Sequence, residues 1–287
     1  MKFTTFAWPF ASLFLAIAAG SLLLHHAEPP PAARAAPAQP PTAWPDYSAG
    51  GPGFHEPLGS DGALIAYGYD LISRTSAMIG PEVTDHALRF AGNNLACQNC
   101  HLDGGANRSG LPLVGVATTY PKFSDRDQRV INLTERLNEC MTRSMNGRPL
   151  PDDSREMRAL LAFMNYVGHV PPAPALPPPQ APPLAPDAAR GAVVFTTVCA
   201  ACHQPNGLGQ WRGSARDALG YAFPPLWSSD SFNDGAGMDR YQRIVNFVRF
   251  NMPRGVDPQK PQLTLQQAWD VSAYVIGQPR PHYDAKR

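Results

Sequence analysis

Two short runs of the chain place cysteine and histidine at a spacing that suits one kind of covalent chemistry. Residues 97–101 read Cys-Gln-Asn-Cys-His, and residues 199–203 read Cys-Ala-Ala-Cys-His. Two thiols three positions apart lie about one helical turn apart, so both can form thioethers with the vinyl groups of one haem. The adjacent histidine then faces the iron and supplies a nitrogen ligand. The sequence therefore predicts two covalently bound haem c groups, attached by six residues: Cys97, Cys100, His101, Cys199, Cys202 and His203.

The alternatives for these motifs are a thioredoxin-like redox pair, half of a zinc site and a structural disulfide. A redox pair does not need the following histidine, and no βαβ pattern surrounds either motif. A zinc site would use both pairs jointly, and the histidines and the spacer between the motifs argue against that.

Each iron needs a second axial ligand or an open site. After His203, the candidates are Met238, Met252 and His282. Met252 follows a predicted helix, and Pro253 restricts the backbone there, so the loop can present the thioether to the iron. Met238 stands at a predicted helix start, where packing is the better interpretation. The sequence therefore predicts His203 and Met252 as the ligands of the second iron.

The fifth cysteine, Cys140, follows the first motif and is the candidate for the other iron, opposite His101. Spacing alone leaves a thiolate and a methionine equally open, with four methionines as rivals: Met141, Met145, Met157 and Met164. An inert buried cysteine or an intermolecular disulfide is a further alternative. The choice matters because a thiolate donates electron density and makes ferric iron harder to reduce.

Helical patterns surround both motifs, and no segment shows a convincing strand alternation. The fold is therefore predicted to be mainly α. The predicted helices start at Ser60 or Asp61 and end near Arg74, cover 127–145, begin again at Asp153 or Ser154, and cover 188–199, 238–250 and 264–276.

A proline-rich run over residues 170–186 divides the chain and is predicted to be a semi-rigid polyproline linker. We expect two tandem cytochrome c-like domains, at 60–169 and 187–287. The preceding residues 36–59, rich in Pro, Ala and Gly, are predicted to be a disordered tether.

The N-terminus has the features of an export signal. Lys2 precedes an apolar run over residues 6–24, and residues 33–35 form a small-x-small cleavage candidate. A cleaved signal peptide at 1–35 is favoured over a signal-anchor because the run is interrupted. The sequence therefore predicts a periplasmic protein that contacts the membrane only if this segment stays uncleaved.

Composition limits the class of protein. With 44% hydrophobic and 16% charged residues, the chain is neither wholly disordered nor a coiled coil. Lys+Arg 24 against Asp+Glu 23 leaves a net charge of +1, so no basic excess indicates nucleic-acid binding.

Several further runs are shared with one family. They are residues 94–104, 120–126, 135–140, 143–147, 223–227, 231–233, 235–238 and 251–253. Over about residues 60–280 the chain resembles the exported dihaem thiosulfate dehydrogenases, also called tetrathionate reductases. The resemblance implies that two thiosulfate ions are joined to tetrathionate, that the two electrons pass to a soluble or membrane-bound cytochrome, and that the reaction is reversible.

The resemblance also implies roles for particular residues. Cys140 would be the distal ligand of the first, active-site haem, and Arg126, Arg136 and Ser144 would line the substrate pocket. The second haem would transfer electrons. Asn251 is a departure, because some relatives carry a lysine at this position that can bind the second iron.

The residue types agree with this chemistry. Guanidinium groups suit the oxygens of a thiosulfate dianion, and Arg136 stands four residues before Cys140, on the same helix face. For Arg143 and Arg148 a structural role, on a haem propionate or a helix surface, is favoured. The rival functions are a dihaem electron carrier without activity and a haem subunit of a larger respiratory or sulfur-oxidising complex.

Overall fold

The computed structural model describes residues 1–2, 35–174 and 176–284. The signal segment predicted over residues 1–35 lies outside the described residues except at 1, 2 and 35. In the part of the chain that the structure describes, no helix is both long and apolar enough to span a membrane.

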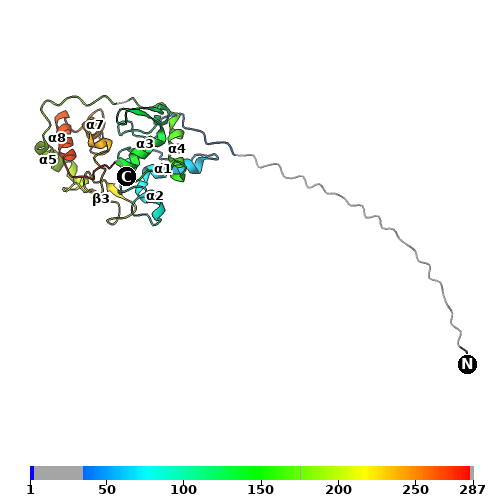
Figure 1. The fold of residues 1–287 in the computed structure, drawn as a ribbon. Helices are drawn as coiled ribbons and strands as arrows, with labels where there is room; N and C mark the ends of the chain where they lie inside the picture. The colour runs from blue at the N-terminus through cyan, green and yellow to red at the C-terminus, as the bar shows by residue number, and fades with distance from the viewer. Residues whose placement is uncertain (3–34, 175, 285–287) are drawn as a thin grey trace. The chain divides into compact units, whose positions relative to one another are not determined.

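The first half of the chain is helical, with its longest helices packed on each other (Figure 1). Gly68 makes the α1–α4 contact close, because a Cβ atom there would lie 2.1 Å from the carbonyl oxygen of Ala159. The helices are α1 (Gly62–Ser73), α2 (Thr75–Ile79), α3 (Leu133–Arg143) and α4 (Arg155–Gly168), with short 3-10 turns at His86–Leu88, Cys97–Asn99, Asp103–Gly105 and Val116–Thr119.

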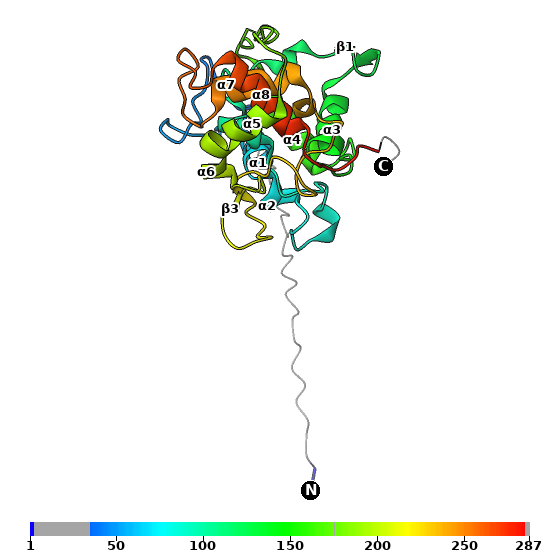
Figure 2. The ribbon, with the colours of Figure 1, turned by 90° about the vertical axis from the view of Figure 1, so that its left-hand side faces the viewer.

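The second half repeats the order of helix, attachment motif, loops and helices. Helix α5 packs on α8, and α7 packs on α8 from another side; Figure 2 shows the three together. The elements are α5 (Ala188–Val194), a π-helical turn (Phe195–Cys199), α6 (Ala200–His203), a 3-10 turn (Gly237–Asp239), α7 (Tyr241–Asn251) and α8 (Leu265–Ile276).

Two short strand pairs, which were not predicted from the sequence, interrupt the helices. Strand β1 (Lys122–Ser124) pairs antiparallel with β2 (Arg129–Ile131), and β3 (Gln210–Trp211) pairs with β4 (Tyr221–Phe223). Strands of two or three residues are too short to show an alternating pattern. The helix predicted over 127–145 therefore begins later, at Leu133.

Local capping explains where several helices begin. Asn132 and Glu135 form a capping box at the start of α3, and the side chains of Ser154 and Thr264 accept from backbone N–H groups of α4 and α8. Asp61 behaves differently, since its carboxylate accepts from the backbone N–H of Ala38 at 2.6 Å.

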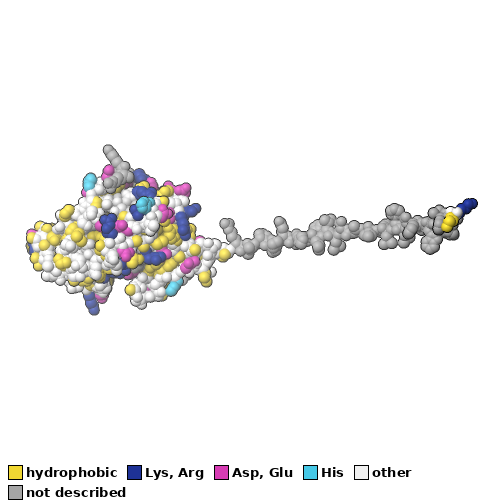
Figure 3. Space-filling model, turned by 90° about the horizontal axis from the view of Figure 1, so that it is seen from below, with side chains coloured by type: hydrophobic (Ala, Val, Ile, Leu, Met, Phe, Trp, Pro, Cys, Tyr) yellow, Lys and Arg dark blue, Asp and Glu magenta, His cyan; other side chains and the backbone are white. Residues whose placement is uncertain are grey.

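The buried apolar residues form two clusters, one centred on each half of the chain. The division is not clean, because Tyr221, Phe232 and Ala236 from the second half belong to the first cluster. Met238 packs against both clusters. Residues after the proline-rich run therefore help to close the first core. On the outside, basic and acidic side chains are interspersed on the face seen in Figure 3.

The proline-rich run has no helix or strand over its described residues. It lies along the surface of the second half of the chain. The carbonyl oxygen of Pro177 accepts from the Asn246 amide at 2.8 Å, and that of Gln180 accepts from the Trp269 indole at 2.8 Å. The run is therefore attached to α7 and α8.

The residues before α1 differ from the disordered tether that we expected over 36–59. They form no helix or strand, but the Trp44 indole donates to the carbonyl of Ala106 at 2.6 Å. The rings of Tyr47 and Phe54 pack against Tyr69 on α1. Three aromatic side chains, Trp44, Tyr47 and Phe54, pack against the first core and hold this proline-rich segment on it.

Candidate functional site

The second attachment motif is built at the end of a helix. Cys199 closes the π-helical turn, and Cys202 and His203 belong to α6. The His203 Nδ1 atom lies 2.8 Å from the carbonyl oxygen of Pro224. This contact makes Nδ1 the donor and leaves the Nε2 lone pair for a metal. Burial lowers the pKa of His203, so the imidazole stays neutral, as an iron ligand must be.

The first motif has the same arrangement. Cys97 lies in a 3-10 turn, and the His101 Nδ1 atom lies 2.6 Å from the carbonyl oxygen of Leu111. Burial lowers the pKa of His101 to about 4, which keeps this imidazole neutral as well. The Thr75 hydroxyl accepts from the Cys97 backbone N–H at 2.9 Å, so the start of α2 holds the first thiol in place.

An apolar cavity of about 390 Å³ adjoins the second motif. Cys199, Cys202 and His203 line one side, and aliphatic and aromatic residues such as Phe223, Ile244 and Val271 line much of the rest. A porphyrin ring is flat and largely apolar, so this lining fits a haem attached to the second motif. Cys100 lines the same cavity, which brings the two attachment motifs to a common wall.

Both methionine candidates for the second iron reach this cavity. Met252 directly follows α7, and Met238 lies in the turn Gly237–Asp239. The third candidate, His282, is 86% exposed at its side chain and lies 2.7 Å from the Asp234 carboxylate. The structure thus takes His282 away from the site, and Met252 stays a prediction.

Cys140 lies on α3, partly buried, beside the first motif. Its charge is one of the causes that raise the pKa of Cys97 and of Cys100, after burial. The four rival methionines pack in the first core with at most 3% of their surface exposed: Met141, Met145, Met157 and Met164. Among the five candidates, Cys140 alone combines partial exposure with this proximity.

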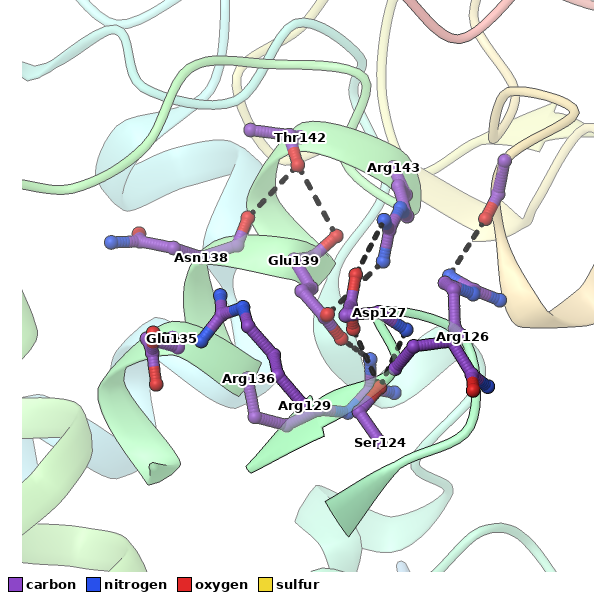
Figure 4. A network of polar contacts seen from close by, with 12 residues as sticks. Ser124, Arg126, Asp127, Arg129, Glu135, Arg136, Asn138, Glu139, Thr142 and Arg143 are labelled. Atoms are coloured by element: carbon purple, nitrogen blue, oxygen red, sulfur yellow. Dashed lines mark hydrogen bonds and ion pairs between the residues drawn. The ribbon is translucent and has the colours of Figure 1, made fainter. Parts of the chain in front are cut away.

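Arg136 and Arg126 lie in the polar network shown in Figure 4. The Arg136 Nη1 atom donates to Glu139 Oε2 at 2.8 Å, and the charge of Cys140 is the first cause that raises the Arg136 pKa. The Arg126 Nη1 atom donates to the carbonyl of Gly235 at 3.0 Å. Burial, together with Arg143 and Arg240, lowers the Arg126 pKa. The structure therefore places Arg136 close to Cys140, and Arg126 in the same polar network.

Arg143 and Arg148, for which the sequence favours a structural role, contact other parts of the protein. Arg143 is 11% exposed at its side chain and makes ion pairs with Glu139 at 3.3 Å and Asp127 at 3.5 Å. Its guanidinium also stacks on the ring of Tyr283. Arg148 donates to the backbone carbonyls of residues 87 and 89.

Ser144, the last predicted pocket residue, is the C-cap of α3 and is partly buried. Its carbonyl accepts from the Asn93 amide at 3.0 Å, and the same amide donates to Ser231 in the second half. Asn93 therefore ties the end of α3 to the other half of the chain.

Sequence reasoning missed several charged residues of this region. Asp127 and Glu139 place two carboxylates among the arginines. Burial lowers the pKa of both His101 and Lys122, and the charges of Arg136 and then Arg243, on α7, lower it further. No local pattern connects Arg243 to the first motif, although a Glu139 three residues after Arg136 could have been recognised as an ion-pair partner.

Two family models match the chain and define its class. The model described as SoxA/TsdA, cytochrome c domain, matches residues 89–169, and the cytochrome c model matches residues 188–277. The protein is therefore a mainly helical chain of two tandem cytochrome c domains, with two covalently bound haem c groups.

Known relatives give the family. The thiosulfate dehydrogenase of Allochromatium vinosum is 36% identical over 234 residues, covering 78% of this chain and 81% of the relative. That of Stutzerimonas stutzeri is 34% identical over 234 residues, covering 79% and 73%. The solved thiosulfate dehydrogenase TsdBA of Marichromatium purpuratum has a TM-score of 0.68 at 30% identity, with 80% of this chain and 49% of that chain covered. The chain belongs to the thiosulfate dehydrogenase family of enzymes.

Proposed function

We propose that this protein joins two thiosulfate ions to one tetrathionate and releases two electrons. The main observation that supports this proposal is that Cys140 and Arg136 lie on one face of α3, beside the first attachment motif. A plain electron carrier needs neither a partly exposed thiol there nor arginines around it. The family membership supports the same substrate class.

The residues that would hold the two haems follow from the donor sets. His101 and Cys140 would bind the first iron, and His203 and Met252 the second. The haem groups, when bound, supply the one-electron acceptors that together take up the two electrons. Residues 60–169 would form the active-site domain and residues 187–287 the electron-transfer domain.

The arginines would bind the substrate, and Cys140 would do the sulfur chemistry. Arg126 and Arg136, with Ser144 nearby, would neutralise and orient the sulfonate oxygens of thiosulfate. The Cys140 sulfur would react while it is not bound to iron. It would form a sulfur–sulfur bond with the terminal sulfur of the first thiosulfate, and two electrons would be removed in this step. The second thiosulfate attacks that same sulfur, tetrathionate leaves, and the Cys140 thiolate returns. No proton is consumed, so no general base is required.

The finer features of the function belong to the same proposal. The reaction runs in both directions, and a soluble or membrane-bound cytochrome accepts the electrons from the second haem. The protein works in the periplasm after export, which the apolar run at the N-terminus supports.

The decisive experiment uses the purified holoprotein in both directions. Thiosulfate with an artificial oxidant should give tetrathionate, and tetrathionate with a reduced viologen should give thiosulfate. If thiosulfate alone fails to reduce the haems, the protein is an electron carrier instead. Tight co-purification of a second protein that is needed for activity would favour the haem subunit of a larger complex.

A further inference from the structure

Asn251, the last residue of α7, precedes Met252 and is held by three hydrogen bonds. It is 5% exposed. Its Oδ1 atom accepts from the Ser109 hydroxyl at 2.9 Å, and its Nδ2 atom donates to the carbonyl of Ser109 at 3.0 Å and to that of Phe247 at 3.1 Å. Two of the three bonds cross from the second half of the chain to the first. Both the oxygen and the nitrogen of the amide are engaged in the protein, which turns this side chain away from the role of an iron ligand.

A second contact holds the other side of Met252. Arg254 Nη2 lies 2.7 Å from Asp103 Oδ1. Asp103 and Ser109 belong to the same loop, which runs from His101 to Leu111. The carbonyl oxygen of Leu111 accepts a hydrogen bond from His101 Nδ1. One loop of the first domain therefore contacts residues on both sides of Met252 and also orients the histidine of the first motif.

We propose that Ser109 and Asn251 are positioning residues that hold Met252 against the second haem. The inference rests on the proposed function in taking Met252 as the distal ligand. Met252 is the C-cap of α7, and its N–H makes the last i to i−4 bond of the helix, to the carbonyl of Val248 at 3.1 Å, because Pro253 has no N–H to continue the series. The Ser109–Asn251 pair adds two bonds across the domain boundary at this helix end, and the Arg254–Asp103 pair adds a third.

The proposal predicts how readily an added ligand displaces the methionine. Imidazole binds the ferric second haem only when Met252 has left, so its apparent dissociation constant rises as the open fraction falls. A hydrogen bond of this kind changes such an equilibrium by about fivefold. Disappearance of the far-red sulfur-to-iron band as imidazole is added reports the second haem and needs no thiosulfate. Failure of the proposed function would appear as a lack of thiosulfate oxidation. Failure of the Ser109–Asn251 proposal would appear as unchanged imidazole binding, so the two failures are distinguishable.

The test titrates the oxidised holoprotein and three variants with imidazole. Ser109→Ala should tighten apparent imidazole binding by about fivefold, and Asn251→Ala, which loses both cross-domain bonds, by more than about tenfold. Asn246→Ala is the matched control, because Asn246 lies on the same helix, is 8% exposed and donates to Pro177 on the linker at 2.8 Å. It should leave imidazole binding within about twofold of the wild type.

The pairing itself is tested by the double variant. Because the one bond that Ser109→Ala breaks is among the two that Asn251→Ala already removes, Ser109→Ala with Asn251→Ala should match Asn251→Ala alone. Equal shifts in all three single variants, or unchanged imidazole binding in Ser109→Ala, would overturn the proposal. Ser109→Ala removes only one hydroxyl, so it decides the question even if Asn251→Ala yields no mature protein.

Discussion

Arg136 and Glu139 form an ion pair on α3, in which Arg136 Nη1 lies 2.8 Å from Glu139 Oε2. Glu139 directly precedes Cys140 in the chain. Glu139 thereby places a negative charge where a dianionic substrate must approach. Glu139→Gln keeps an acceptor oxygen for Arg136 but removes that charge. We expect the KM for thiosulfate to fall by about threefold at low ionic strength, because the local potential becomes more positive.

The matched control for this change is Glu135→Gln. Glu135 lies one turn earlier on α3 and pairs with the exposed Arg129. A glutamine there keeps the capping box. The gain in Glu139→Gln should shrink as salt is added, because screening weakens long-range attraction. An equal gain in Glu135→Gln would mean that the effect is not local to the pocket.

Cys140→Ala should keep both haems and lose activity. Attachment needs only the two Cys-x-x-Cys-His motifs, while turnover needs the Cys140 sulfur as nucleophile. The measurement is haem content together with thiosulfate oxidation and tetrathionate reduction. Wild-type activity in either direction would contradict the proposed mechanism.

Arg136→Leu and Arg143→Leu should separate binding from stability. Arg136 is 40% exposed at its side chain and faces Cys140, so its loss should raise KM by about tenfold with little change in Tm. Arg143 is 11% exposed and paired with two carboxylates, so its loss should destabilise the fold by about 3 kcal/mol. Thermal unfolding and steady-state kinetics of both variants check this. Equal KM changes would indicate that the arginines act through their general field.

Met252→Gly should remove the far-red sulfur-to-iron band of the oxidised protein. A thioether favours ferrous iron, so the second haem should also have the higher reduction potential of the two. Met238→Leu is the control, because Met238 lines the same cavity as Met252 and is the other methionine candidate for the second iron. If the band survives in Met252→Gly and is lost in Met238→Leu, the ligand assignment is wrong.

The acid stability of the network depends on Asp127. Contacts with Glu139 and Ser124, then the charge of Arg143, lower the Asp127 pKa from 3.8 to about 2. A carboxylate with a lowered pKa stabilises the fold fully above its usual pKa and loses this effect as the pH falls through the lowered value. The free energy of unfolding of Asp127→Asn should therefore lie below that of the wild type near neutral pH. The two values should converge as the pH approaches 2.

The sequence by itself determined the chemistry of attachment. Two thiols and a histidine at a set spacing act within one helical turn, so no distant part of the chain has to be known to predict six haem-binding residues. The same holds for helices that start at a capping side chain, such as Ser154 and Thr264. The relation between Arg136 and Cys140 was also predictable, because four residues on one helix fix a common face.

Only the tertiary structure decided which residues of the two halves meet. Ser109 and Asn251 are 142 positions apart, and Arg126 and Gly235 are 109 positions apart, so no local spacing relates them. The burial of Arg143 likewise depends on Asp127 and Tyr283, which reach it from other segments. Helix periodicity and motif spacing act over a few residues, whereas packing selects partners by shape and charge after the chain has folded back on itself.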